Sequence, residues 1–551
     1  MKKYLWAIVL VITGYSPCSW GENIDSDAND VIEYCWQNKV TSTKILSWNA
    51  FSTQFIDPPT FKLLVIPDVY KYVAEVCQGG RKWTVESTNP MVSLVEVWPQ
   101  MNIKTFTLRF LWLDKEGNVL AEETTKRVKA PDWQGFNEPC EDWVAAADRG
   151  MAYLMDVADN GKAPYREPNV PVWIWSCASP TKTDLYAFWD AVNPNGCPMG
   201  YPCITLNRYI GGFLAYAQRN GPQKDEAMKL AKVCADWALK NHQPENCALP
   251  LFPYSTIGMG KFSGGAEGDN VNLLRPCRLA TSFVDLYQIT GNKAYLDYAR
   301  HIANTVMKFQ KSDGSFPYRI NPQSGKVTED YTCAAVEFTT LVDGLKPFGF
   351  DPNMAIAAQR ALDWTLAYVC NTGNWKAIFE DNGTHPAYAN LAGSDTQIVI
   401  RYLCRHKDED PAYLPTARRL NRWLEDQFVL FGPESEAYVH PVRGLLRMKG
   451  PLVFEQYQCW FPMEGHTGSW ILTLIELHKA TGDVTYLDKA KAAANAICAL
   501  QFEDGQFSTM GLRYYKDGVI VSDKESGFNW YNANAAASTG LYALDKYLNS
   551  L

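Results

Sequence analysis

The sequence lacks the residue patterns that usually mark a metal site. It contains neither a C-x-x-C pair nor an H-E-x-x-H motif, and only 7 of its 551 residues are histidine. Such spacings bring thiolates or imidazoles together around zinc, so their absence leaves a structural or catalytic zinc site with little support. We therefore expect a protein that works without a metal or another cofactor.

Positive charge is also scarce. The chain carries 52 Lys and Arg residues against 60 Asp and Glu residues, a formal net charge of −8. Proteins that bind nucleic acid or an anionic membrane surface usually carry an excess of basic residues, so this balance argues against both partners. Disorder is excluded as well, because 47% of the residues are apolar and 13% are aromatic.

The apolar run near the N-terminus is too short for a permanent membrane span. It covers Tyr4 to Thr13, follows two lysines and precedes the small-x-small sequence Ser19-Trp20-Gly21. This order is typical of a secretory signal peptide over residues 1–21, so we expect export across the inner membrane to the periplasm. Cys18 offers a lipid anchor as an alternative, although Tyr-Ser-Pro before it is a poor lipobox.

The 15 cysteines allow disulfides in an exported protein. A buried free thiol is the simpler interpretation for the cysteines within helical patterns, which are Cys234, Cys277, Cys333, Cys370 and Cys498. Cys197 and Cys203 lie in a loop rich in glycine and proline, and they are the predicted disulfide pair.

Residues 45–130 predict a small β-sandwich domain, preceded by a leader over residues 22–45. From residue 61 to residue 128, apolar and polar residues alternate with period two in several short segments. Residues 113–118 supply a hairpin turn between the last two segments. No cluster of catalytic residue types occurs here, so we interpret this domain as structural support or as a carbohydrate-facing accessory.

After Pro131 the hydrophobic period becomes that of helices. We predict twelve helices, near residues 138–158, 204–220, 223–241, 273–290, 293–310, 333–347, 353–370, 394–406, 411–429, 466–481, 484–501 and 532–549. Five alanines, at positions 231, 299, 358, 417 and 490, recur at intervals of 68, 59, 59 and 73 residues. This indicates a repeating unit of two helices. Six such hairpins over residues 135–551 predict an (α/α)6 barrel, so the fold class is mainly α with a small N-terminal β-sandwich.

One stretch of 27 residues occurs twice, at 290–316 and at 481–507, with 12 identical positions. Each copy begins with a Thr-Gly turn, continues through an amphipathic helix and ends in an Asp-Gly loop. Because the same Asp-Gly pair ends two hairpins, we interpret Asp313 and Asp504 as turn formers and not as catalysts.

Connection lengths predict which face of the barrel carries the function. Links after the outer helices are long, covering residues 159–203, 242–272, 311–332, 371–393, 430–465 and 502–531. Because the helices alternate in direction, these links gather on one face, at the N-terminal ends of the inner helices. Unpaired N–H groups and the helix dipole there favour an anion, which suits a substrate with a carboxylate.

Carboxylates are frequent on these long links. Cleavage of a glycosidic bond needs one acid to protonate the leaving oxygen and one carboxylate to activate water or attack the sugar. Glu455 lies in a mostly apolar run over residues 451–461, and such surroundings favour the protonated form that a general acid needs. A salt-bridged glutamate in a strand-like loop is the alternative interpretation. Asp330 and Glu267 are the candidates for the base or nucleophile.

Arginine and aromatic residues share the same links. Arginine binds a carboxylate with a two-pronged guanidinium, so Arg443 or Arg278 is the predicted clamp. The other predicted substrate-binding residues are His440, Tyr331, Trp530, Asp395, Glu464 and His466. For Asp330, Asp395 and Glu464, which lie at or just before the starts of inner helices, an ordinary capping or first-turn role is an alternative.

Three motifs near the C-terminus carry a resemblance to a known family. They are Phe454-Glu455-Gln456-Tyr457, Thr481-Gly482-Asp483 and Asn529-Trp530-Tyr531-Asn532. Together with the signal peptide, the β-sandwich and the helical hairpins, they resemble six-hairpin glycosidases, and most of all glycoside hydrolase family 154. The resemblance implies an exo-acting β-glucuronidase, an exported hydrolase that removes a terminal β-linked glucuronic acid from a glycan. It assigns no catalytic pair.

Other activities remain open, because unsaturated uronyl hydrolases, epimerases and some polysaccharide lyases share this architecture. An unsaturated uronyl hydrolase would hydrate the double bond of a lyase product. A lyase would create that bond and needs a base, for which Tyr331 and His440 are available. A non-catalytic glycan-binding protein is a further alternative.

Overall fold

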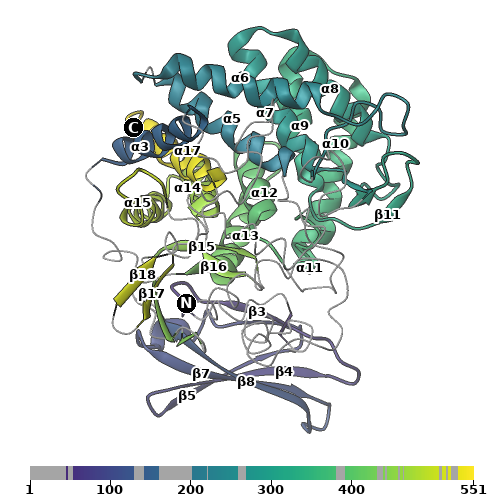
Figure 1. The fold of residues 1–551 in the computed structure, drawn as a ribbon. Coiled ribbons are helices and arrows are strands. Elements are labelled where there is room, and N and C mark those ends of the chain that lie inside the picture. The colour runs from purple at the N-terminus through teal and green to yellow at the C-terminus, as the bar shows by residue number, and fades with distance from the viewer. Residues whose placement is uncertain are drawn as a thin grey trace, which may run out of the picture.

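The computed structural model describes residues 45–46, 54–129, 140, 142–159, 201–219, 221–257, 269–379, 391–430, 439–440, 444–448, 450–456, 459–462, 464–507, 512–516, 519–522 and 531–551. Figure 1 shows strands from the N-terminal part of the chain at one end of the molecule and helices at the other end.

The N-terminal strands form two sheets, a five-stranded one with the order β2-β8-β7-β4-β5 and a three-stranded one with the order β1-β3-β6. Their bounds are β1 (Ile45–Leu46), β2 (Gln54–Phe55), β3 (Thr60–Leu63), β4 (Lys71–Gln78), β5 (Arg81–Ser87), β6 (Met91–Ser93), β7 (Thr105–Leu113) and β8 (Val119–Lys129). Strand β7 pairs with β8 in antiparallel fashion, and Asp114 Oδ1 accepts a hydrogen bond of 2.7 Å from the Asn118 backbone N–H. The predicted hairpin turn is therefore confirmed.

The two sheets share one hydrophobic core. Phe61 of β3 and Phe110 of β7 meet edge to face with their ring centroids 5.0 Å apart, and Trp112 is fully buried beside them. Alternation of buried and exposed residues along β4 and β7 places such side chains on one face of the larger sheet. The predicted N-terminal sheet region is thus present, while its bounds as a separate domain stay a prediction.

Helices occupy the ranges predicted for the second part of the chain. Their bounds are α3 (Trp143–Asp159), α5 (Pro202–Gln218), α6 (Lys224–Lys240), α7 (Arg275–Thr290), α8 (Lys293–Met307), α9 (Ala335–Leu345), α10 (Pro352–Trp364), α11 (Cys370–Thr372), α12 (Ser394–Arg405), α13 (Tyr413–Phe428), α14 (Glu464–Thr481), α15 (Val484–Ala499) and α17 (Tyr531–Leu548). A π-helical turn over Thr365–Val369 joins α10 to α11.

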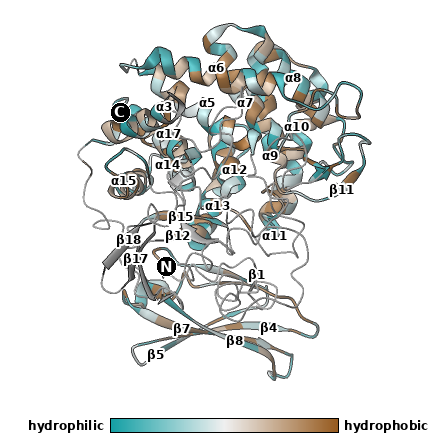
Figure 2. Cartoon of the chain, viewed as in Figure 1, coloured by the Kyte–Doolittle hydropathy of each residue, from teal (hydrophilic) through white to brown (hydrophobic). Residues whose placement is uncertain are grey.

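The long helices form two layers. The inner layer follows the closed order α5, α7, α9, α12, α14, α17 and back to α5. The outer helices α6, α8, α10, α13, α15 and α3 pack respectively against α5, α7, α9, α12, α14 and α17. The chain is therefore mainly helical with an α/α barrel. Figure 2 shows hydrophilic and hydrophobic residues side by side on outer helices such as α6 and α8, as expected for helices with one buried face.

Short strands lie on the connections between these helices. They form three sheets with the orders β11-β10-β9, β12-β15-β16 and β13-β14-β17-β18. Their bounds are β9 (Val271–Asn272), β10 (Arg319–Ile320), β11 (Val327–Glu329), β12 (Val429–Leu430), β13 (Val439–His440), β14 (Gly444–Met448), β15 (Leu452–Gln456), β16 (Cys459–Pro462), β17 (Leu512–Lys516) and β18 (Val519–Ser522). The segment around Glu455 is thus a strand, β15.

The two copies of the repeated stretch have the same local structure. Gln310 Nε2 donates to the Gly314 carbonyl oxygen (3.0 Å) and to a carbonyl of α10 (2.8 Å). Gln501 Nε2 donates to the Gly505 carbonyl oxygen (2.8 Å) and to a carbonyl of α3 (2.8 Å). Each copy therefore ends in a loop that is fastened to the next outer helix.

The Asp-Gly pairs in these loops are turn residues, as predicted. Asp313 Oδ1 accepts a backbone hydrogen bond of 2.9 Å from Ser315, and Asp504 Oδ1 accepts the equivalent bond from Gln506 (3.2 Å). The glycines that follow have φ angles of +95° and +90°, and a Cβ on either would collide with a backbone carbonyl of the next outer helix. Only glycine tolerates both the positive φ angle and the close approach to a backbone carbonyl.

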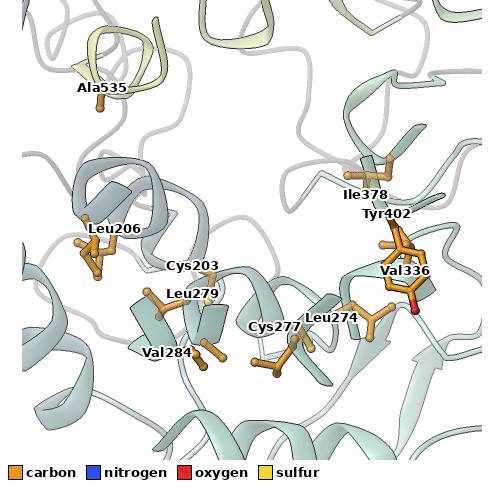
Figure 3. Close-up of a cluster of buried hydrophobic side chains, with 14 of the residues drawn as sticks. Cys203, Leu206, Leu274, Cys277, Leu279, Val284, Val336, Ile378, Tyr402 and Ala535 are labelled. Carbon is orange, nitrogen blue, oxygen red and sulfur yellow. The ribbon is translucent and has the colours of Figure 1, made fainter. Parts of the chain in front are cut away.

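Apolar side chains and small residues close the barrel wall. Figure 3 shows buried side chains from neighbouring inner helices, including Leu206 of α5 and Cys277 and Val284 of α7. Helices α14 and α17 approach closely, because a Cβ on Gly468 would lie 2.5 Å from the Ala536 carbonyl oxygen. Tight packing of this kind leaves little freedom for inner helices to shift.

The cysteine predictions are partly tested. Buried free thiols are confirmed for Cys234, Cys277, Cys333 and Cys370, and Cys498 is a half-buried free thiol. Cys203 is buried with its Sγ 3.2 Å from the Tyr254 carbonyl oxygen, while Cys197 lies outside the described residues. Cys203 is thus a buried free thiol in the first turn of α5, so the predicted disulfide between Cys197 and Cys203 is contradicted.

A buried ionic cluster joins the N-terminal sheets to the barrel. Lys489 Nζ of α15 lies 2.7 Å from Glu425 Oε2 of α13 and 3.3 Å from Asp57 Oδ2 of the N-terminal part. We call Asp57, Glu425 and Lys489 the junction cluster. Arg422 also donates to the Pro58 carbonyl oxygen at 3.0 Å, so these contacts fix the sheets against the outer surface of the barrel.

No helix within the described ranges is long and apolar enough to cross a membrane.

Candidate functional site

Charged side chains gather where the inner helices begin. Arg275 is the first residue of α7, and Arg278 follows one turn later. Glu337 lies in the first turn of α9, Asp395 in that of α12, and His466 near the start of α14. The long connections lead to this end of the barrel, so these side chains converge on the face that the connection lengths single out.

Four of these residues form what we call the arginine–carboxylate cluster. Glu337 Oε1 accepts hydrogen bonds from Arg275 (2.8 Å) and from Arg278 Nε (2.6 Å). Arg278 also donates to Asp395 Oδ2 at 2.8 Å, so one guanidinium bridges two carboxyl groups. The side chains of Glu337 and Asp395 are 0% exposed and that of Arg278 is 16% exposed, so of these three only Arg278 reaches appreciably toward solvent.

The two carboxyl groups of the cluster differ in charge. Burial raises the pKa of Glu337 to about 8 against the opposing effect of Arg278 and Arg275, and the neighbouring Asp395 adds to the rise. Burial also opposes ionisation of Asp395, but Arg278 and Arg275 outweigh it and lower the pKa of Asp395. At neutral pH the pair therefore shares one proton and carries one negative charge beside two guanidinium groups.

Glu455 and His466 face each other beside this cluster. Glu455 Oε1 lies 3.8 Å from His466 Nε2, and their side chains are 12% and 4% exposed. Burial lowers the pKa of His466 although Glu455 acts in the opposite direction, so the imidazole is neutral at pH 7. The distance is too long for a direct hydrogen bond and suits a bridging water or hydroxyl.

Arg208 of α5 is an enclosed cation next to this pair. Its guanidinium lies beside Gly465, where a Cβ would be 3.3 Å from the nearest Arg208 nitrogen. Burial, together with Arg278, lowers the pKa of Arg208 to about 10, whereas Glu455 raises it. Within the described residues no carboxylate lies within ion-pair distance of Arg208, so its charge is left for a ligand or for water.

An axial cavity of about 680 Å³ extends from this group along the barrel. His466 and Glu337 line one end, where both side chains are buried. Arg405 and Lys479 line the other end, and their side chains are 49% and 47% exposed. Among the described residues the cavity therefore opens where the inner helices end, opposite to the face on which we predicted the pocket.

The structure brings together only some of the predicted site residues. Arg278, Asp395, His466 and Glu455 lie in one group, and Arg278 and His466 line the cavity. The capping role considered for Asp395 is too simple, because this first-turn residue is fully buried and bound to Arg278.

Asp330 and Tyr331 lie elsewhere. The Asp330 side chain is 71% exposed and pairs with Lys311 at 3.3 Å. It is not the N-cap of α9, because that position belongs to Ala334. Tyr331 donates its hydroxyl to the Asn374 carbonyl oxygen at 2.6 Å, so this hydroxyl is occupied in holding a connection in place.

The remaining predicted residues are not described at the level of their side chains. Glu267, Arg443 and Trp530 lie outside the described residues. For His440 and Glu464 only the backbone is placed, in β13 and at the start of α14.

Three polar residues around the cavity escaped the sequence-based prediction. These are Arg208, Glu337 and Arg401, whereas Arg275 is expected beside Arg278 at the start of an inner helix. All three belong to inner helices, whereas most of the predicted site residues lie on the long links. In the sequence, such residues could be recognised as single charged positions among apolar ones. Glu337 in the run Ala334-Ala-Val-Glu-Phe-Thr is an example. A charge that must be buried in this way needs a partner or a ligand.

The fold and the site together define an α/α barrel with a charged centre. No family model matches the chain. A segment of 137 residues, 23% of the chain, is 26% identical to mouse mannosyl-oligosaccharide 1,2-alpha-mannosidase IB and spans only 19% of that protein.

Solved structures with a similar course of the chain come from several activities. A family 76 glycoside hydrolase from a bovine Bacteroides thetaiotaomicron strain is 11% identical, with 90% of this chain and 98% of that one covered and a TM-score of 0.47. An unsaturated glucuronyl hydrolase specific for heparin is 10% identical, with 75% and 99% covered and a TM-score of 0.44. A D-mannose isomerase is 11% identical, with 74% and 97% covered and a TM-score of 0.49. Likeness at this level does not choose an activity, so the function has to be argued from the site.

Within the described residues, no group of histidine, cysteine, aspartate and glutamate side chains is arranged to hold a metal ion.

Proposed function

We propose that this protein is an exported glycoside hydrolase that removes a terminal β-linked glucuronic acid from a glycan, with Glu455 as the general acid. The observation that carries the proposal is the arrangement of Glu455, His466 and Arg208 at the inner end of the axial cavity. A weakly solvated carboxyl group, a neutral imidazole and a guanidinium without an ion pair among the described residues meet there.

Each of these groups suits one part of such a reaction. Glu455 lies on β15, directly after the buried residues Leu452, Val453 and Phe454, so the strand holds its carboxyl group in a fixed place. A glycosidic oxygen between Glu455 and His466 can receive a proton from Glu455 while the imidazole holds the sugar hydroxyl beside it. Arg208 offers the uronate carboxylate a charged partner, and no carboxylate among the described residues forms an ion pair with it.

The second carboxylate of the mechanism is assigned to Glu267. Asp330, the other candidate, is exposed and paired with Lys311, so its position does not support a role beside Glu455. Arg278 is engaged by Glu337 and Asp395, so Arg208 is a better carboxylate clamp than Arg278.

Product analysis tests this function directly. The purified protein should release saturated glucuronate from oligosaccharides capped with β-linked glucuronic acid. An unsaturated uronyl hydrolase would instead consume the ultraviolet absorbance of lyase products, and a lyase would create such absorbance from a saturated polymer. Binding without turnover of any of these substrates would contradict the enzymatic function.

A matched pair of variants tests the residue assignment. Glu455→Gln should reduce kcat by roughly 10²-fold or more with unchanged unfolding, because an amide cannot act as the acid. Asp330→Asn removes the other candidate acid, and its kcat should stay close to that of the wild type. The reverse outcome, with loss of kcat in Asp330→Asn alone, would move the chemistry to the surface around Lys311.

Export and family membership belong to the same proposal. The mass of the mature protein recovered from the periplasm should show cleavage after residue 21, whereas a lipid-modified Cys18 would appear in the membrane fraction. The resemblance of residues 454–457, 481–483 and 529–532 to glycoside hydrolase family 154 supports the choice of glucuronic acid.

A further inference from the structure

The axial cavity is positively charged although the chain as a whole has a net charge of −8. Among the described residues its lining contains six cationic side chains and three carboxylic ones. The cations are Arg208, Arg278, Arg401, Arg405, Lys479 and Lys546, and the acids are Asp285, Glu337 and Glu476. Because Glu337 is protonated at neutral pH, the excess of positive charge inside the barrel is larger still.

Most of these cations have an ordinary structural explanation. Arg278 belongs to the arginine–carboxylate cluster. Arg405 lies 3.6 Å from Glu476, and Lys479 lies 2.9 Å from the same carboxylate. Arg405, Lys479 and Lys546 also lie in the last turns of inner helices, where positive charge offsets the negative end of the helix dipole.

Arg401 has no such explanation. It lies in the middle of α12, two turns from its first residue and one turn from its end. Its NH1 nitrogen donates to the Ser469 carbonyl and hydroxyl oxygens and to the Thr473 hydroxyl, each at 3.1 Å. These neutral acceptors on α14 hold the guanidinium across the cavity. No carboxylate within the described part of the chain pairs with it, and its other N–H groups remain for a ligand.

The electrostatics agree with this geometry. Burial, together with repulsion from Arg405 and Arg278, lowers the pKa of Arg401 to about 9, although Glu476 and Asp395 act in the opposite direction. Arg278 also repels Arg208 and contributes to the lowered pKa of Arg208, while Glu455 acts in the opposite direction. Both guanidinium groups line the cavity, and neither forms an ion pair with a carboxylate among the described residues, so an anion in the cavity would offset the excess of positive charge there.

We infer that the axial cavity binds a small oxyanion, held by Arg401 with Arg208 at its inner side. The ligand enters past Arg405, Lys479 and Lys546, which attract anions to the open end. The shared ligand chemistry is a tetrahedral or planar oxyanion, and a sugar carboxylate and an inorganic phosphate or sulfate are two sources of it. A cavity of about 680 Å³ accommodates a monosaccharide acid as well as an inorganic ion. The inference does not depend on the proposed hydrolase activity.

Calorimetric titration of the full-length mature protein with sodium glucuronate, sodium phosphate and sodium sulfate tests the site. Ionic strength is held constant with sodium chloride, so that general screening does not contribute. At least one of the three anions should bind saturably to the wild type. Arg401→Met should raise its Kd about tenfold or more, because a charge-assisted, two-pronged contact is lost.

Arg418→Met is the matched control, because Arg418 is an exposed arginine on the outer helix α13. It removes the same charge and should leave the Kd unchanged. If Arg401→Met does not fold, the double variant Lys479→Met/Lys546→Met tests the open end of the cavity, and its Kd should rise severalfold.

The titrations distinguish a sugar acid from an inorganic ion as the ligand, and they distinguish the axial cavity from the proposed catalytic site. Binding of glucuronate alone assigns a sugar acid to the cavity, and binding of phosphate or sulfate assigns an inorganic ion. The inference is overturned if none of the three anions binds, or if Arg401→Met and the double variant bind like the wild type. It is also overturned if Glu455→Gln abolishes glucuronate binding while Arg401→Met does not, since the anion then lies at the proposed catalytic site.

Discussion

The junction cluster and the arginine–carboxylate cluster are both buried groups of charges, but they differ in their balance and in their neighbours. In the junction cluster, Lys489 lies between Glu425 and Asp57, and the side chains of Lys489 and Glu425 are 5% and 4% exposed. Burial opposes the charge on Lys489, but the two carboxylates outweigh it and raise the pKa of Lys489. One cation thus joins two carboxylates at a contact between two parts of the chain.

The arginine–carboxylate cluster is not closed in this way. Its two guanidinium groups face carboxyl groups that share a proton, and Arg208 and Arg401 add positive charge close by. It also borders the axial cavity, whereas Asp57, Glu425 and Lys489 do not line that cavity. The contrast suggests that a buried cluster in which carboxylates surround a single cation holds elements together, while one with excess positive charge beside a cavity prepares a binding site.

Removal of a shared cation should have the largest effect. Arg278→Met leaves Glu337 and Asp395 without the guanidinium that bridges them, and the free energy of unfolding should fall by about 3–5 kcal/mol. Urea denaturation followed by circular dichroism measures this. Arg418→Met on the barrel surface should change it by less than about 0.5 kcal/mol. Equal effects of the two substitutions would contradict a buried bridging role.

A slightly smaller loss is expected at the junction cluster. Lys489→Met leaves Glu425 buried without its cation, and stability should fall by about 3 kcal/mol. This loss of stability is at the lower end of the range for a broken buried ion pair, because Asp57, which is 43% exposed, can turn toward solvent. Anion binding in the cavity should be unchanged by this substitution. A changed Kd would show that the two clusters are coupled and not independent.

The shared proton gives the arginine–carboxylate cluster a pH dependence. The pKa of Glu337 is raised in the folded state, so the folded state binds a proton that the unfolded state has released above about pH 4.3. This proton therefore adds to the free energy of unfolding at low pH, and its contribution decreases as the pH rises toward 8. The decrease is on the order of 2–3 kcal/mol between pH 5 and pH 8.

Glu337→Gln keeps the hydrogen-bonding shape of the protonated acid without the titration. The variant should lose less stability than the wild type between pH 5 and pH 8, as measured by urea unfolding at each pH. Glu425 and Asp285, whose pKa values burial also raises, titrate in both proteins and cancel in the difference. Parallel pH profiles for the two proteins would show that Glu337 is already ionised at pH 5.

The smallest change in stability is expected for an exposed ion pair, which is neither buried nor beside the cavity. Asp330→Asn breaks the contact with Lys311, and stability should change by no more than about 0.5 kcal/mol because solvent screens such a pair. Thermal unfolding monitored by fluorescence is sensitive enough to detect this. A loss comparable to that in Arg278→Met would mean that Asp330 has a buried partner when the protein is in solution.

The positions of the helices were predictable because their signals are local. Hydrophobic periodicity, Thr-Gly turns and alanine spacing all act within one hairpin, and the repeated Gln and Asp-Gly residues occupy equivalent contacts in both copies. Even the assignment of Asp313 and Asp504 to turns followed from their repetition in the sequence.

The site was only partly predictable because its partners come from different hairpins. Arg278 and Glu337 are separated by 59 residues, and Arg278 and Asp395 by 117. Neither pairing leaves a pattern in a single sequence. Asp330 and Asp395 both lie close to the start of an inner helix, yet one is exposed and the other is fully buried. Tertiary packing alone decides between these outcomes.

The pair of hydrogen bonds that Gln501 donates has a consequence for the topology of the barrel. It fastens the loop at Gly505 to α3, whose residues lie about 355 positions earlier, and Gln310 makes the same pair of hydrogen bonds between successive units. The last unit therefore meets the first as any unit meets its successor. A circular permutant that begins at the tight turn after α7, with the original termini joined by a flexible linker, should consequently fold into the same ring.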